Sequence, residues 1–200
     1  ETNSSAATFP ALVNAVGTAG TGLDGIVGTI PAAGGNFSML SRVGGTGADE
    51  FFGVAIGKFD TLFVTGFTAS TDLPLGTGAS AATRYDVTQN GSNDGLVGKL
   101  PRTGRPGAAS DPWIATYFGG SGDDRGNTLR AYTSYALMIF GESQSTNFPT
   151  HNTTDGGALY DSTANGGWDI IWFNLSTDLK TLLFSTYVGG AQNDYLGETG

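Results

Sequence analysis

An internal repeat of 70–75 residues constrains the fold of this chain more than any other feature. A double glycine, followed by a short polar turn and an aspartate, occurs three times. The three copies are RVGGTGAD at 42–49, YFGGSGDD at 117–124 and YVGGAQND at 187–194. A motif that recurs at a fixed spacing indicates a structural unit rather than a unique active site, so the repeat has to be assigned before any local feature is interpreted.

Several other landmarks keep the same spacing. They are DGIVGTI, DGLVGKL and DIIWFNL, which start at 24, 94 and 169; STDLP and STNFP, which start at 70 and 145; and YDVTQNG and YDSTANG, which start at 85 and 160. TFP at 8–10 is an earlier, eroded copy of the second set. This spacing divides the chain into four parts. They are the second half of a unit at 1–45, complete units at 46–120 and 121–190, and the start of a further unit at 191–200.

Each complete unit is predicted to contain four β-strands. The segments are short, rich in β-branched and aromatic residues, and bounded by Gly, Pro, Asn and Asp. They cover 50–56, 61–68, 95–100 and 113–118 in one unit, and 127–133, 135–142, 169–175 and 182–188 in the next. No window of helical length shows a 3.6-residue apolar stripe with caps. Repeated four-stranded units predict an all-β chain folded as β-propeller blades.

The motifs also resemble a known family. In this chain they read YFGGSGDD at 117–124, FVTGFTASTDLP at 63–74, DGLVGKL at 94–100 and STYVGG at 185–190. They resemble the SBBP-type (seven-bladed β-propeller) repeat over nearly the whole chain, most weakly over residues 1–23. The resemblance implies a propeller in a cell-surface or secreted protein and implies no catalytic site. Two positions depart from the pattern, because Arg42 replaces the tyrosine and Asn193 replaces the first acidic residue of the turn.

The number of units is too small for a closed propeller. The chain holds roughly 2.8 blades, whereas closed propellers have about four to eight. Open ends leave unpaired strand edges. We therefore expect one propeller domain that is a segment of a longer polypeptide, with copies that complete one another in an oligomer as the alternative.

The composition excludes several classes of function. Nine Lys and Arg against 18 Asp and Glu give a net charge of −9, which argues against nucleic acid and anionic membrane surfaces as partners. No apolar run approaches the roughly 20 residues that a membrane helix needs. Without Cys there is no disulfide, thiolate nucleophile or Cys-ligated metal.

Five Asn-x-Ser/Thr sequons bear on the compartment. They are candidate glycosylation sites in a secreted protein, and turn residues otherwise. They start at Asn3, Asn36, Asn90, Asn152 and Asn174. Their excess over chance, together with the family resemblance, predicts an extracellular or cell-surface protein.

The carboxylates after the double glycines are the candidates for a repeated calcium site. Calcium prefers carboxylate and carbonyl oxygens presented on a turn. The candidates are Asp49, Asp123, Asp124 and Asp194. We prefer a structural interpretation, in which each aspartate accepts backbone N–H bonds and fixes the turn between units. No cofactor is otherwise predicted.

No catalytic constellation is recognisable. A structural hydrogen bond is the preferred role for Asp24, Asp94 and Asp169, since they open the third strand of successive units and should not converge. His151 is the sole histidine and lies on a polar loop beside Asn152, without recognisable partners, so it indicates neither a catalytic triad nor a His-based zinc site. No G-x-S-x-G nucleophile elbow follows a predicted strand and opens a helix. The glycine-rich phosphate-binding motifs also need a following helix, and none is predicted.

Aromatic side chains are the candidates for stacking on sugars. Most fall inside predicted strands, where packing in the core is expected. These are Trp113, Trp172, Tyr117 and Tyr187. Tyr85 and Tyr160 lie on the long polar loops 69–93 and 144–167 and are the glycan-stacking candidates. The loops could either form a contact surface or pack on neighbouring units.

Together these features predict a non-enzymatic extracellular propeller module. We expect a structural, assembly or adhesive role in a surface protein or appendage, with other protein copies or domains, and glycans, as partners. One alternative is a lectin-like propeller with a sugar pocket on each blade. The other is a polysaccharide lyase or hydrolase with a channel site, which would need converging carboxylates or an Arg/Tyr pair.

Overall fold

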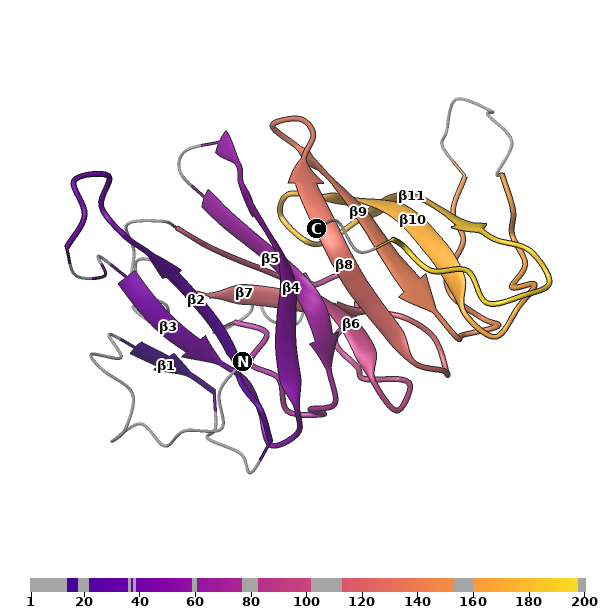
Figure 1. Ribbon diagram of the computed structural model, residues 1–200, viewed down its shortest axis with the longest axis horizontal. Coiled ribbons are helices and arrows are strands. Elements are labelled where there is room, and N and C mark those ends of the chain that lie inside the picture. The colour runs from indigo at the N-terminus through magenta and orange to yellow at the C-terminus, as the bar shows by residue number, and fades with distance from the viewer. Residues whose placement is uncertain are drawn as a thin grey trace.

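The protein folds into a row of β-sheets (Figure 1). The computed structural model describes residues 14–17, 22–35, 37, 39–58, 61–76, 83–101, 113–152 and 160–197. Within these ranges the regular elements are β-strands, and none is an α-helix. The prediction of an all-β chain is therefore confirmed.

Three sheets follow one another along the chain. The first has the order β1-β3-β2, with β1 (Asn14–Val16), β2 (Gly25–Thr29) and β3 (Met39–Val43). The second is an antiparallel meander of β4 (Asp49–Ile56), β5 (Thr61–Thr68), β6 (Asp94–Pro101) and β7 (Ile114–Phe118). The third repeats this meander with β8 (Asp124–Ala131), β9 (Ala136–Ser143), β10 (Asp169–Ser176) and β11 (Leu182–Val188).

The strands form where they were predicted, with one shift. The segments 127–133 and 135–142 were expected to be strands, but β8 and β9 begin at Asp124 and Ala136. β8 begins earlier because Asp124 is already paired with Ser143 at the sheet edge. It also ends earlier because Tyr132 N–H donates to the Ala136 carbonyl at 3.0 Å and closes the turn.

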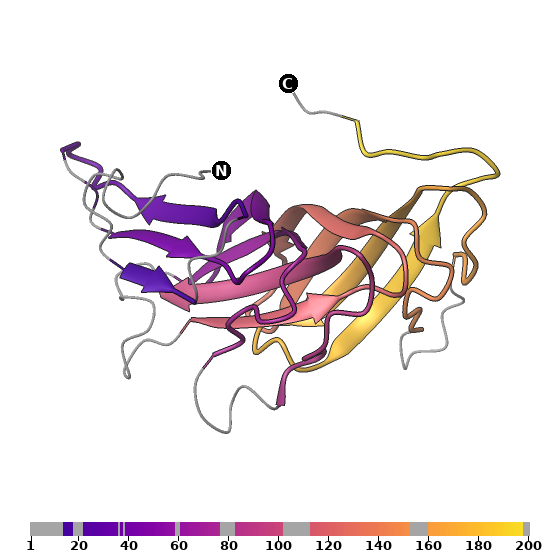
Figure 2. The same ribbon diagram turned by 90° about the horizontal axis from the view of Figure 1, so that it is seen from below.

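The second and third sheets pack face to face around one core, as Figure 2 shows. Period-2 alternation in β10 turns Ile171, Phe173 and Leu175 toward the second sheet, and all three are fully buried. The second sheet supplies Phe63, Val97 and Phe118, among others, to the same cluster. Burying each large apolar side chain stabilises the fold by roughly 1.5–3 kcal/mol. This core joins the two complete units into one body.

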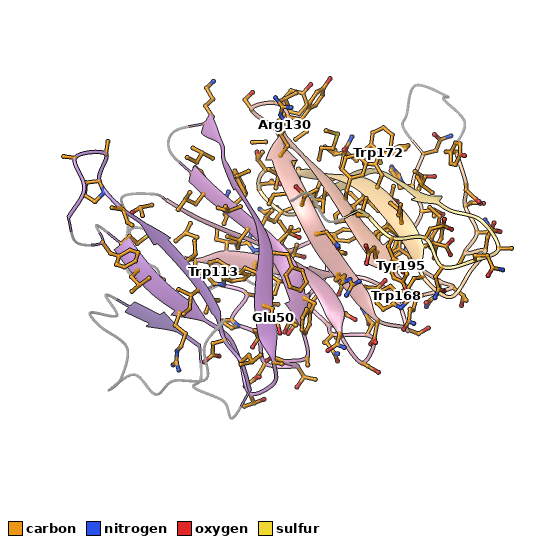
Figure 3. All side chains as sticks on the ribbon, viewed as in Figure 1. Glu50, Trp113, Arg130, Trp168, Trp172 and Tyr195 are labelled. Atoms are coloured by element: carbon orange, nitrogen blue, oxygen red, sulfur yellow. The ribbon has the colours of Figure 1, made fainter. Side chains whose placement is uncertain are left out.

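A second core lies between the first and second sheets. Figure 3 shows Trp113 there, and its indole N–H donates to the Pro74 carbonyl at 2.7 Å. Trp113, Tyr117 and Tyr187 are buried as predicted. Trp172 differs from the prediction: it is only half-buried, since it lies on the face of the third sheet that points away from the second.

The described parts of the long loops cover the outer edge of their own sheet. Tyr117 N–H donates to the Asp86 carbonyl at 3.2 Å, and Tyr187 N–H donates to the Asp161 carbonyl at 3.0 Å. β1 takes the corresponding place beside β3, in a parallel pairing that the sequence did not predict. Covering an edge strand in this way satisfies backbone groups that would otherwise remain open for pairing.

The described strands form an open row and not a closed ring (Figure 1). β2 and β3 correspond to the last two strands of a unit, in agreement with the repeat. Consequently, one face of the second sheet is only partly covered, and one face of the third sheet has no further sheet against it in the described residues.

Candidate interaction surface

In the second and third sheets, the aspartate that follows the double glycine begins the first strand, and its carboxylate is hydrogen-bonded to the end of the second strand. We call this arrangement a latch. The Asp49 carboxylate accepts hydrogen bonds from Gly45 N–H (2.8 Å), Ser70 Oγ (2.8 Å) and Thr68 Oγ1. Ser70 Oγ in turn accepts Gly47 N–H at 2.8 Å. The carboxylate is fully buried. Its oxygens are thus used inside the fold.

The next unit repeats this latch with the same geometry. Asp124 accepts hydrogen bonds from Gly120 N–H (2.8 Å), Ser145 Oγ (2.6 Å) and Ser143 Oγ. Ser145 Oγ accepts Gly122 N–H at 2.8 Å. The Thr/Ser-x-Ser segment at the end of the second strand is therefore the partner of the aspartate. Sequence reasoning aligned this segment in STDLP and STNFP but did not connect it with the carboxylate.

The first glycine of each pair makes room for two carboxylates. At Gly119, a Cβ atom would lie 2.6 Å from Asp124 Oδ2, and the φ angle of +149° further disfavours a side chain. A Cβ atom at Gly44 would collide with Asp24 Oδ1 and lie 2.9 Å from Asp49 Oδ2. Close approach of the chain to buried carboxylates explains why glycine occupies this position.

The aspartates that open the third strand of each unit also fix turns. Asp94 accepts hydrogen bonds from Asn90 N–H (2.7 Å) and Gly91 N–H (2.9 Å), and Asp169 accepts the equivalent bonds from Asn165 (3.0 Å) and Gly166 (3.2 Å). Burial raises the pKa of Asp94 to about 6, although these donors lower it, and the nearby Asp124 charge raises it further.

In the first unit, the equivalent aspartate, Asp24, is bound by an ion pair instead. Asp24 binds the Arg42 guanidinium at 3.2 Å, and both side chains are buried. Burial raises the pKa of Asp24, and the positive charge of Arg42 opposes this effect. The departure of Arg42 from the tyrosine of the repeat therefore has a structural partner in the same sheet.

The calcium candidates lie at these latches. Asp123 Oδ1 accepts hydrogen bonds from the N–H and side-chain amide of Asn93, both at 3.2 Å. Asp49 and Asp124 are engaged as described above. Among the described residues, no group of three or more His, Cys, Asp or Glu side chains is arranged to hold a metal ion. The geometry thus gives these carboxylates hydrogen-bonding roles within the turns.

The third latch is incomplete. Asp194 N–H donates to the Trp168 carbonyl at 2.7 Å, as Asp124 N–H does to Asn93 at 2.9 Å. The Asp194 carboxylate accepts Gly190 N–H at 2.7 Å. No hydroxyl donor from the described residues reaches it, and the site is partly exposed. The backbone thus repeats the first half of the latch, and no Thr/Ser-x-Ser segment among the described residues is bound to it.

The outer side of the third sheet carries an apolar surface, which we call the open face. It consists of Met138, Phe140, Ile170, Trp172, Phe184 and Val188. Trp172 stacks on Phe140 with a centroid distance of 5.6 Å and contacts Phe184 edge-on at 5.1 Å. All six side chains are half-buried.

The equivalent surface of the second sheet is buried. Phe63 and Val97 occupy the positions of Met138 and Trp172 one repeat earlier, and they are only 3% and 0% exposed because the third sheet covers them. Conversely, Val54 on β4 is 63% exposed, whereas its equivalent Leu129 on β8 is 7% exposed. Positions that the repeat buries in one sheet are therefore exposed or half-buried in the other.

A pocket of about 400 Å³ lies beside the first strands of the second and third sheets. It is lined by Phe52, Arg125, Asn127, Glu142, Tyr195 and Leu196. Figure 3 shows Trp168 and Tyr195 next to each other at its margin, 6.4 Å apart. Arg125 and Tyr195 thus meet in one pocket, although sequence reasoning did not select either residue.

The polar groups of this pocket are largely paired with each other. Arg125 Nε donates to Glu142 Oε2 at 2.8 Å, and the guanidinium lies 4.8 Å from the Trp168 ring. Leu196 N–H donates to Glu142 Oε1 at 2.8 Å. The Asn127 Oδ1 atom is buried and has no hydrogen-bond partner. A hydroxyl-bearing ligand would supply the missing donor.

The glycan-stacking candidates occupy different environments despite their equivalent positions. Tyr85 packs against the core of the second and third sheets, and its N–H donates to the Leu179 carbonyl at 2.9 Å. Burial raises the pKa of its hydroxyl to about 12. Tyr160 is 76% exposed. The difference arises because a following sheet covers Tyr85 and none in the described residues covers Tyr160.

The sequons are also unequal. Asn152 is exposed beside His151, whose backbone bridges Ser185. Asn90 is exposed, but its side-chain amide donates to Asp86 at 2.9 Å. Asn174 lies inside the central strand β10, with its Oδ1 atom buried. Asn3 and Asn36 lie outside the described residues. Asn90 and Asn152 are therefore the two exposed sequon asparagines among the described residues.

The described residues contain no helix with the length and apolar character needed to cross a bilayer. In comparisons with known proteins, no family model matches the chain, and no curated protein matches it significantly in sequence. The resemblance to the SBBP-type repeat thus remains a prediction that rests on the motifs.

Proposed function

We propose that the chain is a run of β-propeller blades that serves a non-enzymatic, structural role in an extracellular assembly. The observation that carries the proposal is the pair of equivalent sheets with equivalent latches, whose end surfaces lack the cover that the same positions receive inside the row. Contact between the first strands β4 and β8 is consistent with blades that meet at their inner edges. Other protein copies or domains are the proposed partners.

The use of the repeated carboxylates supports a structural role. Asp49, Asp94 and Asp124 are fully buried and accept hydrogen bonds that hold turns and strand ends together. A catalytic carboxylate has to reach a substrate, and these three are surrounded by donors from their own chain. Their recurrence in each unit is what an architectural device requires.

Three measurements on the natural protein test this function. Surface labelling of intact source cells should tag the protein, and the intact mass should show hexose-sized increments if sequons are occupied. The purified chain, immobilised, should then capture copies of itself or other proteins of the same surface. Exclusive recovery inside the cell, or no capture from the surface fraction, would contradict the proposal.

Glycan binding is the second candidate function. The observation that favours it is the pocket beside Trp168, in which Asn127 Oδ1 has no partner and Arg125, Tyr195 and Phe52 supply polar and aromatic groups. A glycan array should give binding that the Asn127→Ala variant loses and the Tyr160→Ala variant keeps. Loss with Tyr160→Ala alone would instead favour the loop tyrosines.

A further inference from the structure

Basic side chains gather at one end of the joint between the second and third sheets. The chain as a whole has a net charge of −9, but five of the seven Lys and Arg residues in the described ranges lie at this end. Figure 3 shows Arg130 there, at the opposite end of the sheets from Glu50. The five residues lie in the turns after β4 and β10, near the ends of β6 and β8, or against the β10–β11 turn, and are Lys58, Lys180, Lys99, Arg130 and Arg84. This end therefore carries a local positive potential in an acidic protein.

The cations nearest the joint are not part of the repeat. One unit later, Thr133 stands at the position of Lys58 in the first turn of the sheet. Asn174 stands at the position of Lys99 in the third strand, since Lys99 pairs with Phe63 and Asn174 with Met138. Residues that a blade requires recur in each unit, as the latch aspartates do. The architecture of the blade therefore does not explain these lysines.

Lys99 and Arg84 converge on the same turn of the third sheet. Lys99 Nζ donates to the Thr177 carbonyl at 2.9 Å, and Arg84 Nη1 donates to the next carbonyl, that of Asp178, at 3.3 Å. Burial lowers the pKa of Lys99, and the Arg84 charge lowers it further, with the Asp178 charge opposing both effects. Among the described residues, neither cation forms an ion pair with a carboxylate. Two positive charges are thus held together without a bound counter-charge from this part of the chain.

The two cations also keep unused hydrogen-bond donors. Arg84 is only 8% exposed, and its Nε and Nη2 atoms are buried without a hydrogen-bond partner. These two groups form one edge of the guanidinium, which is the edge that binds two oxygens of an anion in parallel. Lys99 has three ammonium protons and uses one of them on Thr177. Four donors on two cations match an acceptor with three or four oxygens better than a carboxylate with two.

A pocket of about 240 Å³ lies beside Lys99. Lys58 from the β4–β5 turn, Thr133 and Ser134 from the β8–β9 turn, and Thr177 also line it. Thr177 is fixed in the wall, because its hydroxyl donates to the Ser134 carbonyl at 3.2 Å. Both sheets that form the pocket are complete four-stranded units, so the strands that border it belong to the described part of the chain. The wall therefore combines cationic and hydroxyl groups from two sheets.

We infer that this pocket and the neighbouring Arg84, together called the basic site, bind a tetrahedral oxyanion. The ligand is either a free sulfate or phosphate ion or the sulfate group of an acidic polysaccharide. Its oxygens accept hydrogen bonds from the Lys99 ammonium and from the free edge of Arg84. The inference goes beyond the structural role proposed above, and it rests neither on that role nor on the pocket beside Trp168.

The test titrates sodium sulfate into the ¹⁵N-labelled whole chain, with sodium chloride adjusted to keep the ionic strength constant. The amide signals of Thr177 and Asp178 are followed, and we expect saturable shifts at both. Lys99→Gln keeps a donor for the Thr177 carbonyl but loses the charge, so it should weaken sulfate binding at least about ten-fold. Arg84→Lys is a second, independent variant. It keeps the charge and loses the two-donor edge, and it should weaken binding to a similar degree.

Arg130→Gln is the matched control. It removes one positive charge from an exposed residue at the same end of the sheets, outside the pocket, and should change the affinity for sulfate by less than about two-fold. Saturable shifts that are absent with sulfate would overturn the inference. Equal weakening by Lys99→Gln, Arg84→Lys and Arg130→Gln would also overturn it, since the effect would then be one of overall charge.

Dextran sulfate and neutral dextran distinguish the two sources of the anion. If dextran sulfate shifts the same amides and binds more tightly per sulfate group than the free ion, the ligand is an acidic polysaccharide. Equal affinity per sulfate group assigns the site to the free ion, and neutral dextran should shift neither amide. The proposed structural function fails separately, when the immobilised chain captures no surface protein, whatever the result with sulfate.

Discussion

Ser145 Oγ donates a 2.6 Å hydrogen bond to the Asp124 carboxylate across a separation of 21 residues. Ser70 does the same for Asp49 at 2.8 Å and the same separation. Each bond ties the residue just after the second strand of a sheet to the start of its first strand. The double-glycine motif is therefore one half of a latch, and the Ser-containing segment is the other half.

Removing the aspartate carboxylate of a latch should lower the free energy of unfolding strongly only where the serine or threonine hydroxyls are bound to it. Asp124→Ala leaves Gly120 N–H and two serine hydroxyls without their acceptor, and we expect the free energy of unfolding to fall by about 3–5 kcal/mol. Asp194→Ala loses one partly exposed bond and should change it by less than about 0.5 kcal/mol. Chemical denaturation of both variants measures the contrast. Similar losses would show that the latch contributes little.

The second glycine of each pair gives a matched comparison. A Cβ atom at Gly120 would lie 2.5 Å from Asn147 Oδ1 and 2.8 Å from Ser145 Cβ, whereas a Cβ atom at Gly190 has no neighbour within 4 Å. Gly120→Ala should therefore lower the free energy of unfolding by about 2 kcal/mol or more, and Gly190→Ala should be near neutral. Thermal unfolding of the two variants distinguishes them. A destabilising Gly190→Ala would mean that the third turn is also closed.

The sequence was sufficient to predict the all-β class and the four-stranded units but not the pairing of groups within them. The β-branched and aromatic residues of the strands and the Gly, Pro, Asn and Asp that bound them act locally, so four-stranded units could be read from the sequence. The bond between Asp124 and Ser145 joins residues from different elements, and a repeat shows that both recur without showing that they meet. Arg42 was visible as a departure from the pattern, yet its partner Asp24 became evident only in the folded sheet.

The same limit explains the misplaced aromatic residue. Trp172 lies in a strand of strong β-propensity, and sequence reasoning placed it in the core as it placed Trp113. Whether a strand residue is buried depends on which face the next sheet covers, and this follows from the position of the unit in the row. Tyr85 and Tyr160 differ for the same reason.

Equivalent apolar residues on the first strands should differ in their contribution to stability. Leu129 is packed against the second sheet and is 7% exposed, so Leu129→Ala should lower the free energy of unfolding by about 2–4 kcal/mol. Val54 is 63% exposed, and Val54→Ala should change it by less than about 0.5 kcal/mol. Urea denaturation of the Leu129→Ala and Val54→Ala variants measures both changes in the free energy of unfolding. A large effect at Val54 would indicate that its surface is covered in solution.

The stability of the fold should fall as pH rises through the range in which Asp94 ionises. Its pKa is about 6 in the folded protein against 3.8 for the ordinary side chain, because burial disfavours the charged form. The folded state then binds more protons than the unfolded state between these values, so the free energy of unfolding decreases as pH increases from about 4 to 6.

The Asp94→Asn variant removes this titration. The free energy of unfolding of the wild type minus that of Asp94→Asn should therefore decrease as pH rises across the same window, whatever the constant effect of the substitution on the bonds to Asn90 and Gly91. Denaturant titrations at several pH values measure it. A difference that does not vary with pH would contradict the raised pKa.

We infer that a following sheet completes each latch, and amide hydrogen exchange at three equivalent glycines measures whether it does. Gly45, Gly120 and Gly190 each donate their N–H to an aspartate carboxylate, at 2.8, 2.8 and 2.7 Å. We expect Gly45 and Gly120 to exchange at least about a hundred-fold more slowly than Gly190, because only their latches are buried and closed by serine hydroxyls. Equal protection of all three amides would contradict it.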